Sequence, residues 1–375
     1  MGGHDGLSRS LRLLALCLAL CCLFACAKKA VPPFPPSPAV TMDEEPDFFC
    51  AWLRPQNQDM TSWTELAPAL RRSMAYLQRK PATAKACSTG GEPVTWGELA
   101  ETAALLHALL PELDANPALF QETFRWISVP GGIKYSSYYE PRMRASRKPA
   151  PGLRPIYALP PEMRAYKARH KGKYHSREKI DGGLVLAGRG LELAWADPVD
   201  IYFLQIQGSG RLQFDDGTEA WVNYAGQNGH KYRASGRIMA EKGVRLRRGD
   251  IFEQREWFAA HPERMDEIFF ENPSYVFFQF GTRGAIGAMG YPIEEWISLA
   301  TDPGFLPLGS VVAFGVGTPV PGGEVVTMRG IGLAQDKGGA IKGNRIDLYA
   351  GGSDRGRYVA SFLDAQGPAW LLLRR

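Results

Sequence analysis

The sequence predicts a folded α+β protein that is mainly β. Two segments near the N-terminus, about 61–80 and 97–110, carry apolar residues at helical spacing. From about residue 125 onward, short runs broken by Gly and Pro predict strands, with helical interludes near 235–242 and 254–271. Hydrophobic residues make up 45% of the 375 residues and charged residues 22%, the proportions of a folded chain. This length allows two domains, because single cores stop growing at roughly 250–300 residues.

The first 26 residues have the pattern of a bacterial signal segment. Two arginines precede an apolar run from Leu13 to Ala25. A helix of about 13 residues spans only about 20 Å, short of a hydrocarbon core of roughly 30 Å. The run ends in Leu23-Phe24-Ala25-Cys26, which resembles a lipobox, in which the cysteine is acylated and becomes the first mature residue. We therefore expect a lipoprotein signal peptide at 1–25 and lipidation at Cys26, with ordinary secretion as the alternative.

The residues after Cys26 predict a tether and a location. Ala27 stands where an Asp often marks retention in the inner membrane, so the sorting rule that it resembles predicts the outer membrane, facing the periplasm. Residues 26–46 are rich in proline and predict an extended, semi-rigid linker. Only Cys50 and Cys87 remain in the mature chain, and the two could pair in an oxidising compartment.

Two helices are expected to contribute core stripes and no chemistry. In the first, Ser62 and Glu65 have the spacing of a capping box. The apolar residues that should share one face are Leu66, Leu70, Met74 and Leu77 in the first helix, and Leu99, Ala103, Leu106 and Leu110 in the second.

Several ligand classes have no support in the sequence. The six histidines form no HExxH motif or paired Cys/His spacing, so we expect no metal site. No GxGxxG opens a helix and no Walker loop occurs, so we expect no cofactor. A net charge of +5 is too dilute to indicate nucleic acid, and the basic pieces 142–148 and 245–248 lack interleaved aromatic residues.

The segment 335–349 contains the most informative pair of acidic residues. Asp347 lies in an alternating strand pattern in which Ile346 and Leu348 point to one face and Asp347 to the other. Because the apolar face should seek the core, Asp347 should project toward solvent or a groove. Asp336 stands at a strand end before two glycines. From periodicity alone, the simpler interpretation is a surface ion pair of Asp347 with Arg345, worth under about 1 kcal/mol.

This segment resembles the three-aspartate signature of the membrane-bound lytic murein transglycosylase A family. By this resemblance the third aspartate is Asp347, the second Asp336 and the first Asp302. Further blocks follow in family order over about 135–350, together with a matching C-terminal end: Tyr138-Tyr139-Glu140-Pro141, FLQIQGSG at 203–210, YAGQNGHKY at 224–232, ENPSYVFF at 271–278 and Trp370-Leu371-Leu372-Leu373. One position departs from the pattern, because Trp296 stands where the family tends to place an arginine.

The resemblance implies cleavage, without water, of the β-1,4 bond between N-acetylmuramic acid and N-acetylglucosamine in peptidoglycan. Asp347 would be the catalytic residue, first as general acid on the glycosidic oxygen and then as base on the muramoyl C6 hydroxyl, which closes a 1,6-anhydro ring. One carboxyl suffices because the substrate supplies the nucleophile, whereas ordinary glycosidases use two. Asp347 would need a pKa raised from about 3.9, by burial or by the supporting carboxylates Asp336 and Asp302.

The remaining candidate site residues are assigned to glycan binding. They are Tyr138, Tyr139, Gln207, Ser209, Asn228 and Lys342. Gln207 shares a predicted strand face with Gln205, so both amides could line a sugar groove, and the glycines beside Ser209 would let the backbone approach the glycan. The structural alternatives are a β-turn at Ser209, a turn at Asn228, buried tyrosines and a loop cap at Lys342.

The resemblance also implies the architecture. A double-psi β-barrel would form from 47–141 and 281–375, with a second, smaller β domain, 142–280, inserted in it and the glycan between them. Two other functions stay open: a hydrolase of the same bond, with Asp336 or Glu140 as the second carboxylate, and a non-catalytic lipoprotein that binds peptidoglycan.

Overall fold

The computed structural model describes residues 37–375 except 89–90, 92 and 282–283. The chain divides into the units Met1–Ser37 and Pro38–Arg375, and everything below concerns the second. The predicted signal peptide, Cys26 and most of the proline-rich linker lie outside the described residues. Within the described part, no helix has the length and apolar character needed to cross a membrane.

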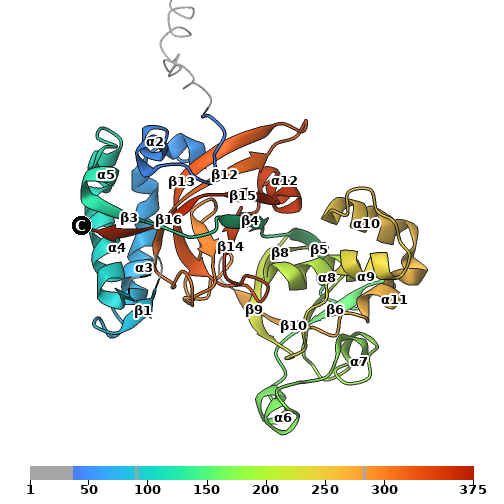
Figure 1. The fold of residues 1–375 in the computed structure, drawn as a ribbon. Coiled ribbons are helices and arrows are strands. Elements are labelled where there is room, and N and C mark those ends of the chain that lie inside the picture. The colour runs from blue at the N-terminus through green and yellow to red at the C-terminus, as the bar shows by residue number, and fades with distance from the viewer. Residues whose placement is uncertain (1–36, 89–90, 92, 282–283) are drawn as a thin grey trace, which may run out of the picture. The chain divides into compact units, whose positions relative to one another are not determined.

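The N-terminal part of this unit is mainly helical. Its elements are α2 (Pro46–Ala51), η1 (Pro55–Gln58), η2 (Trp63–Leu66), α3 (Ala67–Leu77), β1 (Lys85–Cys87), β2 (Val94–Thr95), α4 (Trp96–Leu113) and α5 (Leu119–Thr123). Figure 1 shows α3, α4 and α5 beside β3 and β16 of the large sheet. Among the cysteines of this part, Cys50 is a free, buried thiol, so it forms no disulfide with Cys87.

The first predicted helix is shorter than expected and begins with a 3-10 turn. Ser62 caps that turn by accepting from the Thr64 N–H, but Glu65 accepts from the N–H of Thr61 rather than completing a box with Ser62. The expected apolar face is confirmed, with Leu66, Leu70 and Leu77 buried. The second predicted helix is confirmed as α4, and its N-terminus carries a capping box, made by Thr95 and Glu98, that the sequence reading missed.

An eight-stranded sheet forms the centre of the molecule. Its strands are β3 (Phe124–Ser128), β4 (Ile133–Tyr138), β11 (Ser298–Ala300), β12 (Val311–Pro319), β13 (Val325–Asp336), β14 (Arg345–Tyr349), β15 (Ala365–Gly367) and β16 (Ala369–Arg374), and α12 (Asp354–Phe362) follows β14. The order is β15-β4-β14-β11-β13-β12-β16-β3, so the pairings found among the described residues end at β15 and β3 without closing a barrel. The largest buried cluster joins this sheet to α3 and α4.

The strands β5–β10 lie between β4 and β11 in the chain and belong to other sheets. One sheet has the order β10-β9-β8-β5, and β6 pairs with β7. The elements of this segment are β5 (Arg142–Ala145), β6 (Arg154–Tyr157), α6 (Met163–Arg169), α7 (Arg177–Asp181), β7 (Glu192–Ala196), α8 (Pro198–Gln207), β8 (Ser209–Phe214), β9 (Glu219–Gln227), α9 (Ser235–Glu241), α10 (Ile251–Ala260), η4 (Pro262–Arg264), α11 (Met265–Phe269) and β10 (Val276–Gly281). The chain therefore leaves the large sheet once and returns once.

The prediction of a strand around Gln205 and Gln207 is wrong, because these residues lie in the last turn of the helix α8. The Asp197 carboxylate accepts from the N–H groups of Val199 and Asp200, and Pro198 starts the helix. Gly208 ends it with φ of 84°, a left-handed conformation that suits glycine. These capping signals outweigh an alternation that is only four residues long. The interlude near 235–242 is confirmed as α9, whereas that near 254–271 is interrupted between α10 and α11.

A buried glutamine ties the helical part to the large sheet. Gln58 is fully buried. Its Nε2 donates to the carbonyls of Trp296 (2.6 Å) and Ile331 (2.9 Å), and its Oε1 accepts from the Ile331 N–H (2.9 Å). The amide therefore satisfies polar backbone groups that water does not reach.

We predict that Gln58→Leu lowers the free energy of unfolding by about 2–4 kcal/mol, because it leaves these buried backbone groups unpaired. Urea unfolding followed by far-UV circular dichroism measures the change. The control is Gln78→Leu, at an exposed position at the end of α3, which should change stability little. Equal effects of the two substitutions would contradict the role of Gln58.

Candidate active site

Asp347 lies in β14, between β4 and β11. It pairs with Ser136 of the parallel strand β4 and with Ala300 of the antiparallel strand β11. Its neighbours Ile346 and Leu348 are fully buried, whereas the Asp347 side chain is partly exposed. The predicted alternation is thus confirmed, and Asp347 projects from the face of β14 opposite the core.

The environment of Asp347 favours the protonated carboxyl. Its Oδ1 is inaccessible to solvent and has no hydrogen-bond partner among the described residues. Burial raises the pKa of Asp347 to about 6, and the charge of Asp336 adds to the rise, while the Ser136 hydroxyl and the Arg345 guanidinium oppose it. A carboxyl of this pKa exchanges its proton near neutral pH, as a residue that acts first as acid and then as base requires.

The simple ion pair between Arg345 and Asp347 is not formed within the described part of the chain. The Arg345 guanidinium instead donates to the Ser136 hydroxyl, from Nε at 3.2 Å and from Nη2 at 2.9 Å. Ser136 was not singled out from the sequence, although it occupies the strand position paired with Asp347. The serine therefore stands between the arginine and the acid, and Asp347 keeps an oxygen free of a strong donor.

Asp336 ends β13 on the other side of β11. Ala300 pairs with both Asp336 and Asp347, so the two acids lie on the strands that flank this residue. The Tyr138 hydroxyl donates to Asp336 Oδ2 (2.8 Å), and the backbone N–H groups of Ala288 (2.9 Å) and Lys337 (2.8 Å) donate to Oδ1. Burial raises the pKa of Asp336, whereas these donors oppose the rise. The predicted supporting carboxylate is thus held by three donors.

Asp302 has a different environment. Its Oδ1 accepts from the Gly304 N–H (3.1 Å) and its Oδ2 from the Gly343 N–H (3.0 Å). The N–H of Gly343, the N–H of Gly304 and the charge of Lys342 lower the pKa of Asp302. This carboxylate is therefore ionised and holds the loop before β14 by its backbone. The structure brings Asp347 and Asp336 together and leaves Asp302 as an anchor of the loop.

The two predicted tyrosines differ. Tyr138 is partly exposed, and its ring packs against that of Tyr349 with the centroids 5.2 Å apart. Tyr139 is only 5% exposed, and its backbone N–H donates to Gln207 Oε1 (3.0 Å). Tyr138 thus keeps exposed surface, whereas the Tyr139 ring is covered by protein, as the alternative of a buried tyrosine predicts.

The other predicted binding residues also separate into two kinds. Asn228 is fully buried, and its amide bonds the backbone of His175, Pro273, Tyr275 and His230, so its expected contact with substrate is wrong. Ser209 is buried in β8, opposite Asn223. Gln207 and Lys342 keep exposed side-chain surface.

Trp296 takes part in the backbone around the acids. It is buried with φ of 61°, and its N–H donates to the Tyr349 carbonyl (2.7 Å). The Arg355 guanidinium lies over its ring, 4.9 Å from the centroid. Trp296 therefore joins the start of β11 to the end of β14.

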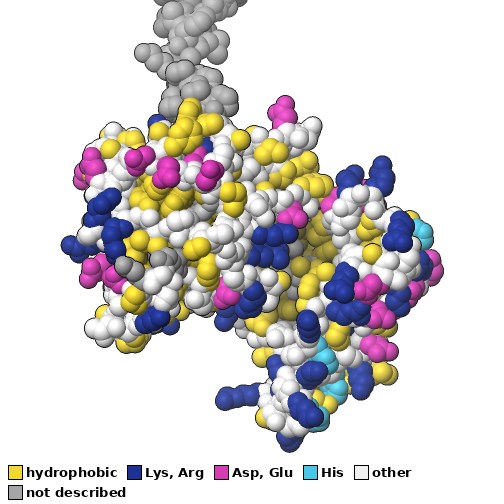
Figure 2. All heavy atoms as spheres, in the orientation of Figure 1, with side chains coloured by type: hydrophobic (Ala, Val, Ile, Leu, Met, Phe, Trp, Pro, Cys, Tyr) yellow, Lys and Arg dark blue, Asp and Glu magenta, His cyan; other side chains and the backbone are white. Residues whose placement is uncertain are grey.

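The helix α6 and the turn after it form a basic surface. This segment, 164–173, contains five Lys or Arg residues and no acidic residue. Arg164, Lys171 and Lys173 are exposed, whereas Lys167 donates to the Gln227 carbonyl. Figure 2 shows Lys, Arg and His side chains gathered in the lower part of the view, where Figure 1 has α6.

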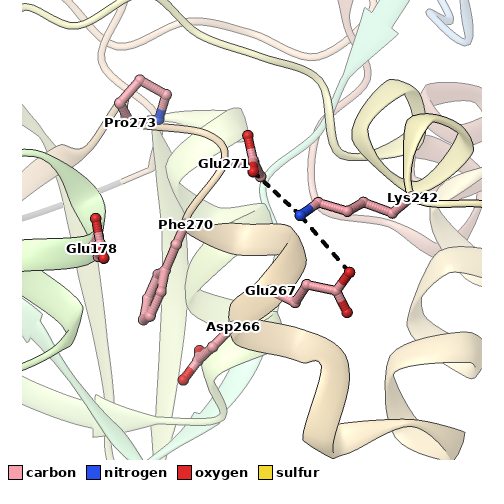
Figure 3. Close-up of a pocket in the computed structure, with 7 residues that line it drawn as sticks. All are labelled: Glu178, Lys242, Asp266, Glu267, Phe270, Glu271 and Pro273. Carbon is pink, nitrogen blue, oxygen red and sulfur yellow. Dashed lines mark ion pairs between the residues drawn. The ribbon is translucent and has the colours of Figure 1, made fainter.

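A cavity of about 410 Å³ lies elsewhere, around α11. Lys242 lines it and forms ion pairs with Glu267 (3.8 Å) and Glu271 (3.3 Å), as Figure 3 shows. The other lining residues are Glu178, Asp266, Phe270 and Pro273. The cavity shares no residue with the group around Asp347, so the candidate active site is defined by the acids and not by this cavity.

We predict that Asp347→Asn stabilises the protein above neutral pH. In the folded protein the pKa of Asp347 is about 6, above the ordinary value of 3.8. The contribution of Asp347 to stability is therefore complete below pH 3.8 and is lost as the pH rises through 6. At pH 8 the variant should be more stable by up to about 3 kcal/mol, and at pH 3.5 the difference should vanish. Denaturant unfolding across this pH range measures it.

Asp302→Asn is the control of opposite sign. The lowered pKa of Asp302 stabilises the fold above the ordinary value, and this contribution is lost as the pH falls through the lowered pKa. The variant should therefore be less stable than the parent at pH 8. If Asp347→Asn also destabilises the protein at pH 8, the inference that burial raises the pKa of Asp347 is wrong.

Comparison with known proteins gives a consistent family. Residues 134–279 match the MltA specific insert domain, and residues 297–373 match the 3D domain. Membrane-bound lytic murein transglycosylase A of Escherichia coli K12 is 30% identical over 251 residues, which cover 64% of this chain and 66% of that protein. The protein of the same name from Vibrio cholerae is 30% identical over 250 residues, with the same coverage. The match thus spans slightly less than two thirds of the length of these relatives.

Solved structures agree with this. A membrane-bound lytic murein transglycosylase from Agrobacterium tumefaciens has a TM-score of 0.69 at 28% identity, covering 83% of this chain and 92% of that one. Escherichia coli MltA with bound chitohexaose has a TM-score of 0.66, covering 82% and 90%, and at 23% identity it supports the fold alone. Two family domains in order, similar sequences and a common fold lead to one conclusion: the chain belongs to the membrane-bound lytic murein transglycosylase A family.

Proposed function

We propose that this protein is a peptidoglycan lytic transglycosylase with Asp347 as its single catalytic residue. It cleaves the β-1,4 bond between N-acetylmuramic acid and N-acetylglucosamine and leaves a 1,6-anhydromuramoyl end. The observation that carries this proposal is the buried Oδ1 of Asp347, which has no hydrogen-bond partner among the described residues, on a partly exposed side chain whose pKa is raised to about 6. The names of the relatives, lytic murein transglycosylase A, support the reaction class.

The mechanism uses one carboxyl twice. Protonated Asp347 donates to the glycosidic oxygen as the bond from that oxygen to the muramoyl C1 breaks, and the carboxylate then faces the positive charge that develops at C1. The C6 hydroxyl oxygen attacks C1, and its proton passes to Asp347, which returns to its starting state. A pKa near the working pH suits both transfers.

The neighbouring residues have separate roles in this proposal. Asp336 supplies the charge that helps to keep Asp347 protonated, and Tyr138 fixes the Asp336 carboxylate. Asp302 holds the loop that carries Lys342, whose exposed ammonium is available for the acidic groups of the substrate. The Gln207 amide at the end of α8 and the backbone at Ser209, where β8 begins, are proposed sugar contacts.

The two carboxylates named for the hydrolase alternative, Glu140 and Asp336, are poorly suited to activate water. Glu140 is 5% exposed and faces Arg211, with the Arg211 Nε 3.7 Å from Glu140 Oε1. Asp336 already accepts three hydrogen bonds, so it is poorly placed to activate water. A non-catalytic protein that only binds peptidoglycan is also less well supported, since binding alone gives no reason to bury Asp347 beside Asp336.

We also propose the organisation that the resemblance implies. Residues 1–25 are a lipoprotein signal peptide, Cys26 carries the lipid, and 26–46 tether the enzyme to the outer membrane, facing the periplasm. The catalytic domain, 47–141 plus 281–375, is a double-psi β-barrel, and 142–280 is an inserted domain that forms the other wall of the glycan groove. The separate sheets of β5–β10 and the word membrane-bound in the relatives' names support this organisation.

We predict that Asp347→Asn reduces the release of soluble fragments from purified sacculi by at least about 1,000-fold, because the amide neither donates an acidic proton nor accepts one. Mass spectrometry of the products from the parent protein should find 1,6-anhydro ends. Reducing ends with added water would contradict the transglycosylase reaction, and full activity of folded Asp347→Asn would contradict the residue assignment. Asp302→Asn is the matched control and should retain the anhydro product.

We predict that the basic segment 164–173 strengthens binding to the acidic sacculus. Changing Arg164, Lys171 and Lys173 to Gln should weaken sedimentation with sacculi by roughly threefold or more at low salt, and the difference should vanish by about 0.5 M salt because exposed charges are screened. The control changes Arg71, Lys85 and Arg245, which are exposed and scattered, to Gln and removes the same total charge. Equal losses would mean that only net charge matters.

A further inference from the structure

A buried carboxylate lies where the chain leaves the large sheet. Glu140 follows β4 and is separated from β5 only by Pro141. Its side chain is 5% exposed. Its backbone N–H donates to the Gly351 carbonyl (2.8 Å), just beyond β14, so Glu140 is fixed to the strand that carries Asp347.

The sheet of β8 and β9 and the chain that returns from it meet at this carboxylate. The Arg211 guanidinium, on β8, approaches Glu140 Oε1 and lies over the Trp221 ring of β9, 4.8 Å from its centroid. The backbone N–H of Arg211 donates to the Pro141 carbonyl (2.8 Å). On the return path, a Cβ at Gly284 would lie 3.5 Å from Glu140 Oε2. The outgoing and returning chains therefore pass on two sides of one acid.

Burial makes this arrangement costly. It raises the pKa of Glu140, while Arg211, the Trp221 indole N–H, the Ala285 N–H and Arg142 oppose the rise. A buried ion pair of this kind often gives little net stability compared with apolar residues, and its best-attested effect is to select one arrangement of the chain. The contacts of Glu140 indicate which arrangement is selected.

The returning segment, 284–293, connects Glu140 to the candidate active site. The Ile293 N–H donates to the Ala285 carbonyl (3.1 Å), which closes the segment into a loop. Within this loop, the Ala288 N–H donates to Asp336 Oδ1 (2.9 Å), and the Met289 N–H donates to the Gln335 carbonyl (3.4 Å). A shift of the loop at Ala285 would therefore move a donor of Asp336.

A second connection passes through two tyrosines. Burial raises the pKa of Tyr349, and the charge of Glu140 is the next largest cause, so the two side chains are electrostatic neighbours. The Tyr349 ring packs against Tyr138, whose hydroxyl donates to Asp336. Both connections from Glu140 thus end at the two sides of the Asp336 carboxylate.

We propose that Glu140 is a positioning residue, which holds the 284–293 loop and Tyr349 so that the Asp336 carboxylate stays beside Asp347. Its place in catalysis rests on the proposed function, but its effect on Asp336 does not. The charged or titratable groups that face Glu140 among the described residues are Arg211, Arg142 and Tyr349, and those that face Asp347 are Asp336, Arg345 and Tyr138.

The test is a titration of Asp347 by carbon-13 NMR in the full chain labelled at aspartate, with Asp347→Asn used for assignment. In Glu140→Gln, the midpoint for Asp347 should fall by about 0.5 pH unit or more, because Asp336 moves away. Exchange of the Ala288 amide hydrogen should become at least about tenfold faster. In sacculus assays, kcat should fall with KM unchanged, and the alkaline limb of the pH profile should move with the NMR midpoint.

The matched control is Glu219→Gln. Glu219 also pairs with Arg211 (3.4 Å) but is more exposed, and it should leave the titration and the exchange of Ala288 unchanged. Glu140→Asp keeps the charge but shortens the side chain, so it should also speed the exchange, and it replaces Glu140→Gln if that variant does not fold. An unchanged midpoint and unchanged exchange in a folded Glu140 variant would overturn the proposal. If both change but the parent protein does not cleave sacculi, only the proposed function fails.

Discussion

The desolvation of one carboxyl on β14 is the constraint on which the rest of the site depends. Asp347 is held by backbone pairing to Ser136 on one side and Ala300 on the other, so it does not move toward water without breaking the sheet. The Arg345 guanidinium is hydrogen-bonded to Ser136, and it forms no ion pair with Asp347 in the part of the chain that the structure describes, so its charge opposes the rise in the pKa of Asp347 without cancelling it. A flexible loop could bring an acid to the substrate, but only a rigid strand maintains the burial that raises its pKa.

Asp302 and Asp347 show how the backbone sets the chemistry of identical side chains. Asp302 accepts hydrogen bonds from two backbone N–H groups, which lower its pKa. Burial instead raises the pKa of Asp347, and the Ser136 hydroxyl and the charge of Arg345 oppose this rise only in part. Asp336 lies between these cases, since it is both buried and well bonded. One of the three acids is therefore suited to proton transfer, the second to supplying charge, and the third to holding a loop.

Much of this was accessible from the sequence, but the decisive contacts were not. The alternation around Asp347 predicted its orientation, because the period of a strand decides which side chains are buried. The alternation at Leu204–Gln207 wrongly predicted a strand. Asp197 and Gly208 cap the two ends of α8, and these capping signals specify a helix. The donor from Ala288 and the partner of Arg345 arise from long-range pairing, and a backbone N–H carries no residue identity that a motif could reveal.

The passage of the chain out of and back into the large sheet has a consequence for building chimeras. Because Glu140 precedes the segment β5–β10 while Arg211 and Trp221 lie inside it, a graft of that segment from a relative carries only part of this contact group. A donor sequence with a different residue at position 211 would leave a buried acid without its cation in an otherwise well-folded hybrid. Compatibility between scaffold and graft is thus decided at this junction as much as by the surfaces that are proposed to bind glycan.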